Sequence, residues 1–232
     1  ICQGGVFTAC YAALFSEKVR AVAFTVTPID FHGDKNDPQT GSGYMNRWAR
    51  ALTHDDIDAL VEAYGTAPGS MVGFAFLMMN PVSNFTKYTI DLIDVMGDEA
   101  RLLNFLRMER WIADRPDHPG EVLRQWFKDL YQDNKLIRNE LVLGDRKVDL
   151  RNITMPALNI YATGDTIIPV SCSKDVGAHF GTKDYTEVAV PGGHIGEQRV
   201  RHAGLGQLPG REAGALQVRP RLVDPHVERA AG

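Results

Sequence analysis

The start of the chain carries the pattern of a nucleophile elbow, a sharp turn from strand into helix that presents a reactive side chain. Cys2 stands at the turn position, and Gly4 and Gly5 supply the small residues that let the flanking segments pack closely. The apolar run 6–14 then reads as a helix. The motif predicts that Cys2 is a nucleophile. The alternative is a small core side chain, because free cysteine is among the most buried residue types.

Two later segments each place an ionisable side chain in a loop directly after a predicted β-strand. One strand ends at Ala162, and its loop carries Asp165; a second strand ends at Val190, and its loop carries His194. Together with Cys2, the chain order is nucleophile, acid, histidine, which is the order of the triad in α/β-hydrolases. The sequence therefore predicts an α/β fold in which these three side chains converge. The two strands are 157–162 and 185–190.

These residue types suit transfer of an acyl group. A thiol is only slightly ionised near neutral pH, and the thiolate is the nucleophile. His194 could take the proton from Cys2, and the start of a helix favours a negative charge. The backbone N–H of Gln3 would donate to the oxyanion. Asp165 would either orient His194 or help to activate an incoming hydroxyl, and both roles stay open.

Six stretches form a pattern that is more specific than any single triad motif. They are 1–5, VTPIDF at 26–31, FLRMERWI at 105–112, RQWFKDLYQDNKL at 124–136, VDLRNITMP at 148–156, and 191–196. In these stretches the chain resembles the catalytic subunit of bacterial polyhydroxyalkanoate synthases, most of all the two-subunit class III type. The resemblance covers Ile1 to about Gly196. It implies that the family's cysteine nucleophile, acid and base fall on Cys2, Asp165 and His194.

The resemblance also implies a function. It implies an acyltransferase that moves 3-hydroxyacyl groups from CoA to Cys2 and then to the hydroxyl end of a growing polyester. The expected substrate is 3-hydroxybutyryl-CoA, and no cofactor is expected. A second synthase subunit, a homo-oligomer and a cytoplasmic location at the polyester granule surface are implied as well. Trp126 and Tyr131 could contact the acyl chain or CoA, although an apolar helical stripe is more often packing.

Two alternatives stay open. The first is another α/β-hydrolase, such as a thioesterase or a polyester depolymerase, with water as the acceptor. The second is a non-catalytic fragment, because the family's catalytic subunit carries a long segment with the first strands of the sheet before its nucleophile. We therefore expect the chain to be partial and the isolated chain to be inactive.

The predicted architecture is a partial α/β-hydrolase fold with an inserted, mainly helical cap or lid. Residues 1–30 and 141–196 would form the core, and residues 31–140 would form the cap. Thr53 and Asp98 are predicted to cap two of its helices. The helix predicted over 99–111 has an apolar face, and a second apolar helical stripe runs over 122–131.

Residues 197–232 are atypical. They contain six Arg and no Lys, Phe, Tyr or Trp, with several Gly and Pro residues. This composition predicts a disordered tail in place of the closing helix that the resemblance would put there. It is read as the product of a frameshift, and the alternative is a genuine basic tail.

Bulk composition excludes several classes of protein. The net charge of −4 argues against general nucleic-acid binding, and no apolar run is long enough to span a bilayer. Three cysteines are too few for a disulfide framework; Cys10 is read as a core residue and Cys172 as a structural one. Four histidines do not pair at metal-ligand spacing and are read as surface or loop groups, so no metal is predicted: His32, His54, His118 and His179.

Overall fold

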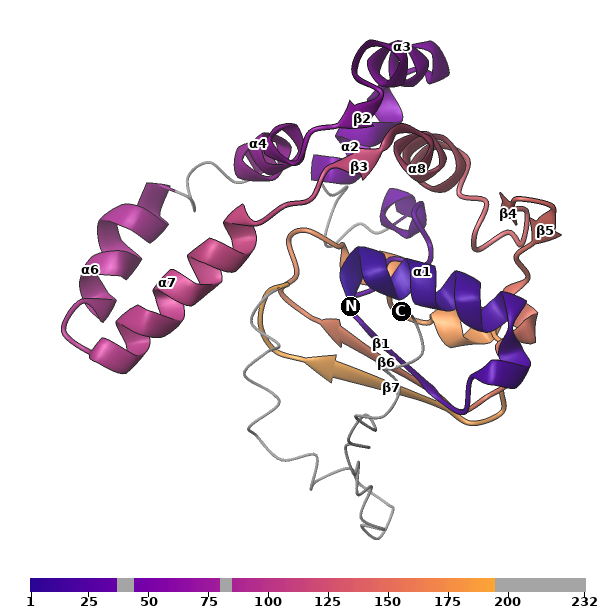
Figure 1. Cartoon of the computed structure of the whole chain (residues 1–232). Helices are drawn as coiled ribbons and strands as arrows, with labels where there is room; N and C mark the ends of the chain where they lie inside the picture. Colours follow the sequence, from indigo (N-terminus) through magenta and orange to yellow (C-terminus); the bar gives the residue numbers. More distant parts are fainter. Residues whose placement is uncertain (37–43, 80–84, 195–232) are drawn as a thin grey trace, which may run out of the picture. The chain divides into compact units, whose positions relative to one another are not determined.

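The computed structural model describes residues 1–36, 44–79 and 85–194 (Figure 1). Its centre is a three-stranded parallel sheet in the order β1-β6-β7. The strands are β1 (Val22–Thr25), β6 (Ala157–Ala162) and β7 (Tyr185–Val190). Both strands predicted to precede the acid and histidine loops are therefore confirmed.

Helix α1 (Cys2–Leu14) lies across one face of this sheet (Figure 1). Its buried side chains join Val22 and Phe24 of β1 in one apolar cluster. Small residues dominate the contact face of α1, which lets the helix approach the sheet closely. Cys10 is 6% exposed within this cluster, which confirms its reading as a core residue.

Three parts of the chain that lie far apart in sequence meet at one end of the sheet. Because the strands are parallel, the carboxyl ends of β6 and β7 share an edge, and α1 begins at the same end in Figure 1. The loops after the two strands are joined by hydrogen bonds from Thr163 N to Val190 O and from Gly164 N to Gly192 O, both 2.9 Å long. The loops carrying Asp165 and His194 are thus held together.

The segment between β1 and β6 is mainly helical. Its α-helices are α2 (Tyr44–Ala51), α3 (His54–Tyr64), α4 (Gly69–Met79), α6 (Leu92–Val95), α7 (Glu99–Ala113) and α8 (Gly120–Arg124). Two π-helical segments are η3 (Lys87–Asp91) and η4 (Gln125–Gln132). Two short antiparallel pairs are β2 (Thr66–Ala67) with β3 (His118–Pro119), and β4 (Val142–Leu143) with β5 (Arg146–Lys147).

Short 3₁₀ helices complete the described elements. They are η1 (Ser16–Lys18), η2 (Gly33–Asn36), η5 (Leu150–Asn152), η6 (Val170–Cys172) and η7 (Val176–His179).

The two predicted helix caps are confirmed. Thr53 and Asp56 form a reciprocal capping box at α3: Asp56 N donates to Thr53 Oγ1 at 3.1 Å, and Thr53 N donates to Asp56 Oδ2 at 2.8 Å. At α7, Asp98 Oδ1 accepts from Arg101 N at 3.0 Å. The stripe predicted over 122–131 is helical, but it is divided between α8 and the wider π-helical turns of η4.

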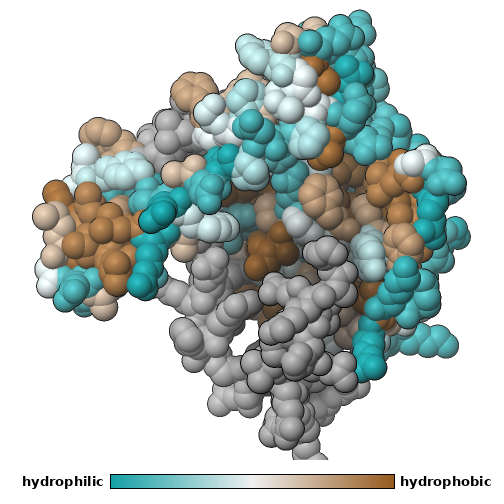
Figure 2. Space-filling model, in the orientation of Figure 1, coloured by the Kyte–Doolittle hydropathy of each residue, from teal (hydrophilic) through white to brown (hydrophobic). Residues whose placement is uncertain are grey.

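The apolar side chains of α6 and α7 are not all covered by the described residues. Ile93 is 64% exposed, and Leu103 and Leu106 are 44% and 51% exposed. Figure 2 shows apolar surface gathered over these two helices. The amphipathic pattern of α7 therefore predicted a helix correctly without predicting a buried face.

Several expectations are not decided by the described residues. The boundaries of the predicted cap at residues 31 and 140 stay predictions. The tail over 197–232 lies outside the residues that the structure describes. Within the described ranges, no helix combines the length and the apolar character needed to cross a membrane.

Candidate active site

Cys2 occupies a strained backbone position at the first residue of α1. Its φ is +49°, a left-handed value that non-glycine residues rarely adopt. Such outliers cluster at active sites because the surrounding structure must hold them in place. No side chain among the described residues caps the start of α1, so its free N–H groups face the position beside Cys2. The start of α1 therefore favours a negative charge in its vicinity.

Only one of the two elbow glycines is required by close packing. A Cβ atom on Gly5 would lie 2.0 Å from Oγ1 of Thr27, just beyond the end of β1. A Cβ atom on Gly4 would meet nothing within 4 Å. The expectation that both glycines serve close packing is therefore right for Gly5 and wrong for Gly4.

The Asp165 carboxylate is fixed through both of its oxygens. Oδ1 accepts hydrogen bonds from the backbone N–H groups of Ile167 at 2.8 Å and Ile168 at 2.9 Å. Oδ2 accepts from Nδ1 of His194 at 2.7 Å, and the Asp165 side chain is only 2% exposed. The loop after β6 therefore presents a pre-oriented, buried acid to the histidine.

His194 lies between Asp165 and Cys2. Its side chain is 14% exposed, and its Nδ1 is taken by Asp165, which leaves Nε2 for another partner. Burial by itself lowers the pKa of His194, but hydrogen bonds to Asp165 and to Cys2 outweigh it and raise the pKa to about 10. The structure thus brings together all three residues that the chain order singled out.

The other two cysteines have a different environment. Burial raises the pKa of Cys10 to about 11 and that of Cys172 to about 12. Cys172 is 1% exposed, and its Sγ accepts a hydrogen bond from Asn46 Nδ2 at 3.4 Å. Both thiols stay protonated near neutral pH, which distinguishes these two buried cysteines from the partly exposed Cys2 at the start of α1.

Trp126 and Tyr131, the predicted substrate contacts, lie in η4 among aromatic rings. The Tyr131 ring is 4.9 Å from the ring of Phe31, and Trp126 is 5.7 Å from Phe31 and 5.8 Å from Phe7, measured between centroids. Burial and the nearby Cys2 raise the pKa of Tyr131 well above its usual range, so its hydroxyl keeps its proton. Trp126 also lines a small apolar pocket together with Phe7 and Leu130.

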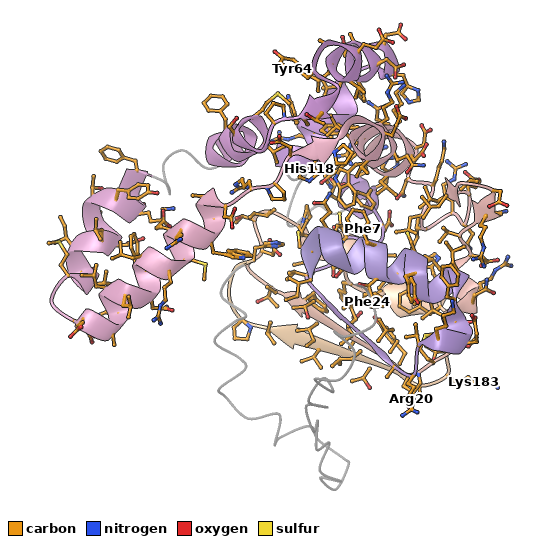
Figure 3. All side chains as sticks on the ribbon, in the orientation of Figure 1. Phe7, Arg20, Phe24, Tyr64, His118 and Lys183 are labelled. Carbon is orange, nitrogen blue, oxygen red and sulfur yellow. The ribbon has the colours of Figure 1, made fainter. Side chains whose placement is uncertain are left out.

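Gln3 contributes a contact that the sequence did not reveal. Its Oε1 lies 3.3 Å from Nε2 of His118, a residue of β3 that is 115 positions away in the chain. Figure 3 labels His118 on β3, above the α1 helix that carries Phe7. The interpretation of His118 as a surface or loop group is therefore wrong. No local signal could have found this pair, because only the tertiary fold joins its two segments.

The remaining histidines divide into two kinds. His32 lies in the turn after β1, which agrees with its reading as a loop group, and it is half-buried there: its Nε2 bonds to Tyr131 O at 2.9 Å and its Nδ1 to Lys35 Nζ at 3.1 Å. His54 and His179 are exposed, as expected. Among the described residues, no group of three or more His, Cys, Asp or Glu side chains could hold a metal ion.

Comparison with known proteins identifies the fold family. A family model described as alpha/beta hydrolase fold matches residues 1–196. The chain belongs to the α/β-hydrolase family. This membership confirms the fold class that the order of Cys2, Asp165 and His194 predicted.

Within this fold family, the chain is most informatively compared with relatives of similar sequence. The chain is 46% identical over 200 residues to a poly(3-hydroxyalkanoate) polymerase subunit PhaC from Synechocystis sp., covering 84% of this chain and 51% of that protein. It is 40% identical over 196 residues to the subunit of the same name from Allochromatium vinosum, covering 84% and 52%. The resemblance to polyhydroxyalkanoate synthases is thus confirmed as a sequence similarity, and the chain spans about half the length of these curated relatives.

Solved structures add only a distant likeness. A crystal structure of a mutant epoxide hydrolase from Bacillus megaterium has a TM-score of 0.47 at 10% identity, covering 87% of this chain and 65% of that one.

Proposed function

We propose that this chain is the catalytic part of a polyhydroxyalkanoate synthase that polymerises 3-hydroxyacyl-CoA and releases CoA. The observation that carries the proposal is the convergence of Cys2, His194 and Asp165 at one edge of the sheet, with Cys2 at a left-handed position. The choice of substrate rests on the relatives named poly(3-hydroxyalkanoate) polymerase. The substrate expected within this class is 3-hydroxybutyryl-CoA.

The first half-reaction would load the enzyme. The Cys2 thiolate attacks the thioester carbonyl, a new C–S bond forms, and the oxyanion accepts a hydrogen bond from the backbone N–H of Gln3 at the start of α1. When the intermediate collapses, the bond to the CoA sulfur breaks. His194, which holds its proton because its pKa is raised to about 10, donates that proton to the leaving thiolate.

The second half-reaction would transfer the acyl group to a hydroxyl. His194, now neutral, accepts the proton of the hydroxyl at the polyester end as that oxygen attacks the acyl-Cys2 carbonyl. The Cys2 thiolate then leaves and the polymer is one unit longer. The contacts of Asp165 favour an orienting role, because Oδ2 holds Nδ1 of His194 and Oδ1 is occupied by two backbone N–H groups.

Apolar surface near the elbow suits the acyl chain. Trp126 lies against Phe7 and Phe31 and lines an apolar pocket, and Tyr131 is packed beside it. We assign these two side chains to contact with the acyl or polyester chain. The same proposal includes residues 31–140 as a cap over the site, a second synthase subunit as a partner, a homo-oligomer, and a location at the polyester granule surface.

The proposal is tested by following CoA release and polymer together in the full-length protein with 3-hydroxybutyryl-CoA. Cys2→Ala should abolish both, and Cys2→Ser should lose most activity because a hydroxyl is much harder to ionise than a thiol. Cys172→Ala serves as the matched control and should still form an acyl-enzyme. Release of CoA with free hydroxy acid and no polymer would instead identify a thioesterase. Wild-type protein that releases no CoA would refute the proposal.

A further inference from the structure

The backbone of His118 is held firmly in place, and one of its two ring nitrogens, Nδ1, has no hydrogen-bond partner among the described residues. Its backbone belongs to β3, where it pairs with Ala67 of β2. On one side Asp117 accepts a hydrogen bond from Gly69 N at 2.7 Å, and on the other Gly120 N donates to Gly65 O at 3.1 Å. The imidazole therefore projects from a short element that is held on both flanks.

The contact with Gln3 requires a hydrogen on Nε2 of His118. An amide oxygen can only accept, so Nε2 of His118 donates to Gln3 Oε1 over 3.3 Å. A neutral imidazole with its hydrogen on Nε2 keeps a lone pair on Nδ1. That nitrogen is buried and has no hydrogen-bond partner among the described residues.

A buried acceptor without a partner is destabilising, so native proteins rarely retain one without a reason. Here the atom belongs to a residue that touches Gln3, the direct neighbour of the proposed nucleophile. A ligand group that donates an O–H or N–H bond would satisfy it. The acyl-CoA of the proposed function has two such donors near its thioester: the hydroxyl on the acyl chain and the first amide N–H of the CoA arm.

Resting on the proposed function, we propose that His118 is a substrate-binding residue whose Nδ1 accepts a hydrogen bond from a hydroxyl or amide N–H close to the reacting thioester. The contact adds a polar anchor to a site whose other predicted substrate contacts, Trp126 and Tyr131, are aromatic. It also links substrate binding to β3, because the same ring holds Gln3 through Nε2.

The test is single-turnover acylation of the full-length protein by 3-hydroxybutyryl-CoA and by butyryl-CoA, which lacks the hydroxyl. His118→Leu removes the acceptor, and His118→Gln offers an amide oxygen in its place. We expect His118→Leu to slow acylation roughly tenfold, with His118→Gln restoring much of the rate. A loss confined to the hydroxylated substrate assigns the hydroxyl as donor, and an equal loss with both substrates assigns the amide. The exposed residue His179 supplies the control variant, His179→Leu, which should react like the wild type.

Three outcomes separate the possible failures. Unchanged rates in His118→Leu would overturn the inference while leaving the proposed function intact. Equal losses in His118→Leu and His118→Gln, accompanied by a lower unfolding temperature, would also overturn it, because they indicate a purely structural role. Wild-type protein that is acylated by neither substrate would remove the proposed function and this inference with it.

Discussion

At the residue scale, the acid of the candidate site is more constrained than an exposed carboxylate. Asp165 uses Oδ1 for two backbone N–H groups and Oδ2 for Nδ1 of His194. The two backbone hydrogen bonds hold the carboxylate in its loop through Oδ1. Oδ2 therefore points toward the histidine. Under the proposed function, these contacts favour an orienting role for Asp165, which would hold His194 with Nε2 available to the thiol.

Asp165→Asn should keep the loop but lose the charge that stabilises protonated His194. We expect CoA release to fall by about 100-fold or more, within the range for loss of general acid–base catalysis. Steady-state CoA release measures the effect. Asp184→Asn changes an exposed acid and should leave the rate unchanged. A rate for Asp165→Asn within twofold of wild type would show that the carboxylate does not act through His194.

The protonation of His194 should make stability depend on pH. Its folded-state pKa is raised from 6.5 to about 10, so protonated His194 stabilises the folded protein fully below pH 6.5. That stabilisation is lost as the pH rises through about 10. Urea unfolding of the wild type and of His194→Gln at several pH values measures the difference in unfolding free energy. The difference should shrink toward pH 10, and a difference that grows with pH would contradict the assignment.

At the element scale, the approach of α1 to the end of β1 depends on one glycine. The space beside Gly5 is filled by Thr27, whose Oγ1, Cγ2 and Cβ would lie 2.0, 2.6 and 2.8 Å from an added Cβ. A side chain at Gly5 would push the first turn of α1 away from the strand. Because Cys2 begins that turn, the elbow would move with it.

Gly5→Ala should therefore destabilise the fold by about 1–3 kcal/mol through overpacking. Gly4→Ala is the matched control: its Cβ meets nothing, and alanine is the better helix former by about 0.5–1 kcal/mol. Chemical denaturation of the two variants measures both effects. Gly5→Ala combined with Thr27→Ala should recover part of the lost stability. Equal stability of the two single variants would contradict the packing argument.

At the scale of the whole described molecule, buried polar contacts tie helix α2 to the segment that directly follows β1. Arg50 of α2 forms a bidentate pair with Asp34 at 2.9 and 2.7 Å and also donates to the carbonyl of Phe31. The Asp34 side chain is fully buried, and that of Arg50 is 14% exposed. Burial acts to raise the pKa of Asp34, but hydrogen bonds from Arg50 and Asn46 outweigh it and lower the pKa.

Asp34→Asn should cost about 3 kcal/mol of unfolding free energy, because it leaves the Arg50 charge buried without its partner. Glu140→Gln is the control for a surface pair: Glu140 and Arg138 are 48% and 57% exposed, so its loss should cost less than about 1 kcal/mol. Denaturant unfolding of both variants gives the comparison. Similar small losses in the two would mean that the buried pair adds little to the attachment of α2.

Local sequence patterns were enough to predict several parts of this protein. Strand runs and their following loops located Asp165 and His194, and a cysteine before small residues located the elbow. Capping residues located the starts of α3 and α7. Each of these patterns extends over only a few residues. The hydrogen bonds and side-chain contacts between such close neighbours in the chain are set by the local backbone conformation. The order of Cys2, Asp165 and His194 along the chain then predicted the α/β-hydrolase fold. Few folds place a nucleophile, an acid and a histidine in this order in loops that follow parallel strands.

Contacts between distant segments could not be predicted from local patterns, because they form only when the whole chain has folded. The bond between His118 and Gln3 and the bond between His32 and Tyr131 O span 115 and 99 positions. The left-handed backbone of Cys2 and the need for Gly5, but not Gly4, also depend on what packs against the elbow. A histidine in a loop has the same local pattern whether it faces solvent or a neighbouring element. Its partner is fixed by how the sheet and the helices come together, which no short stretch of sequence encodes.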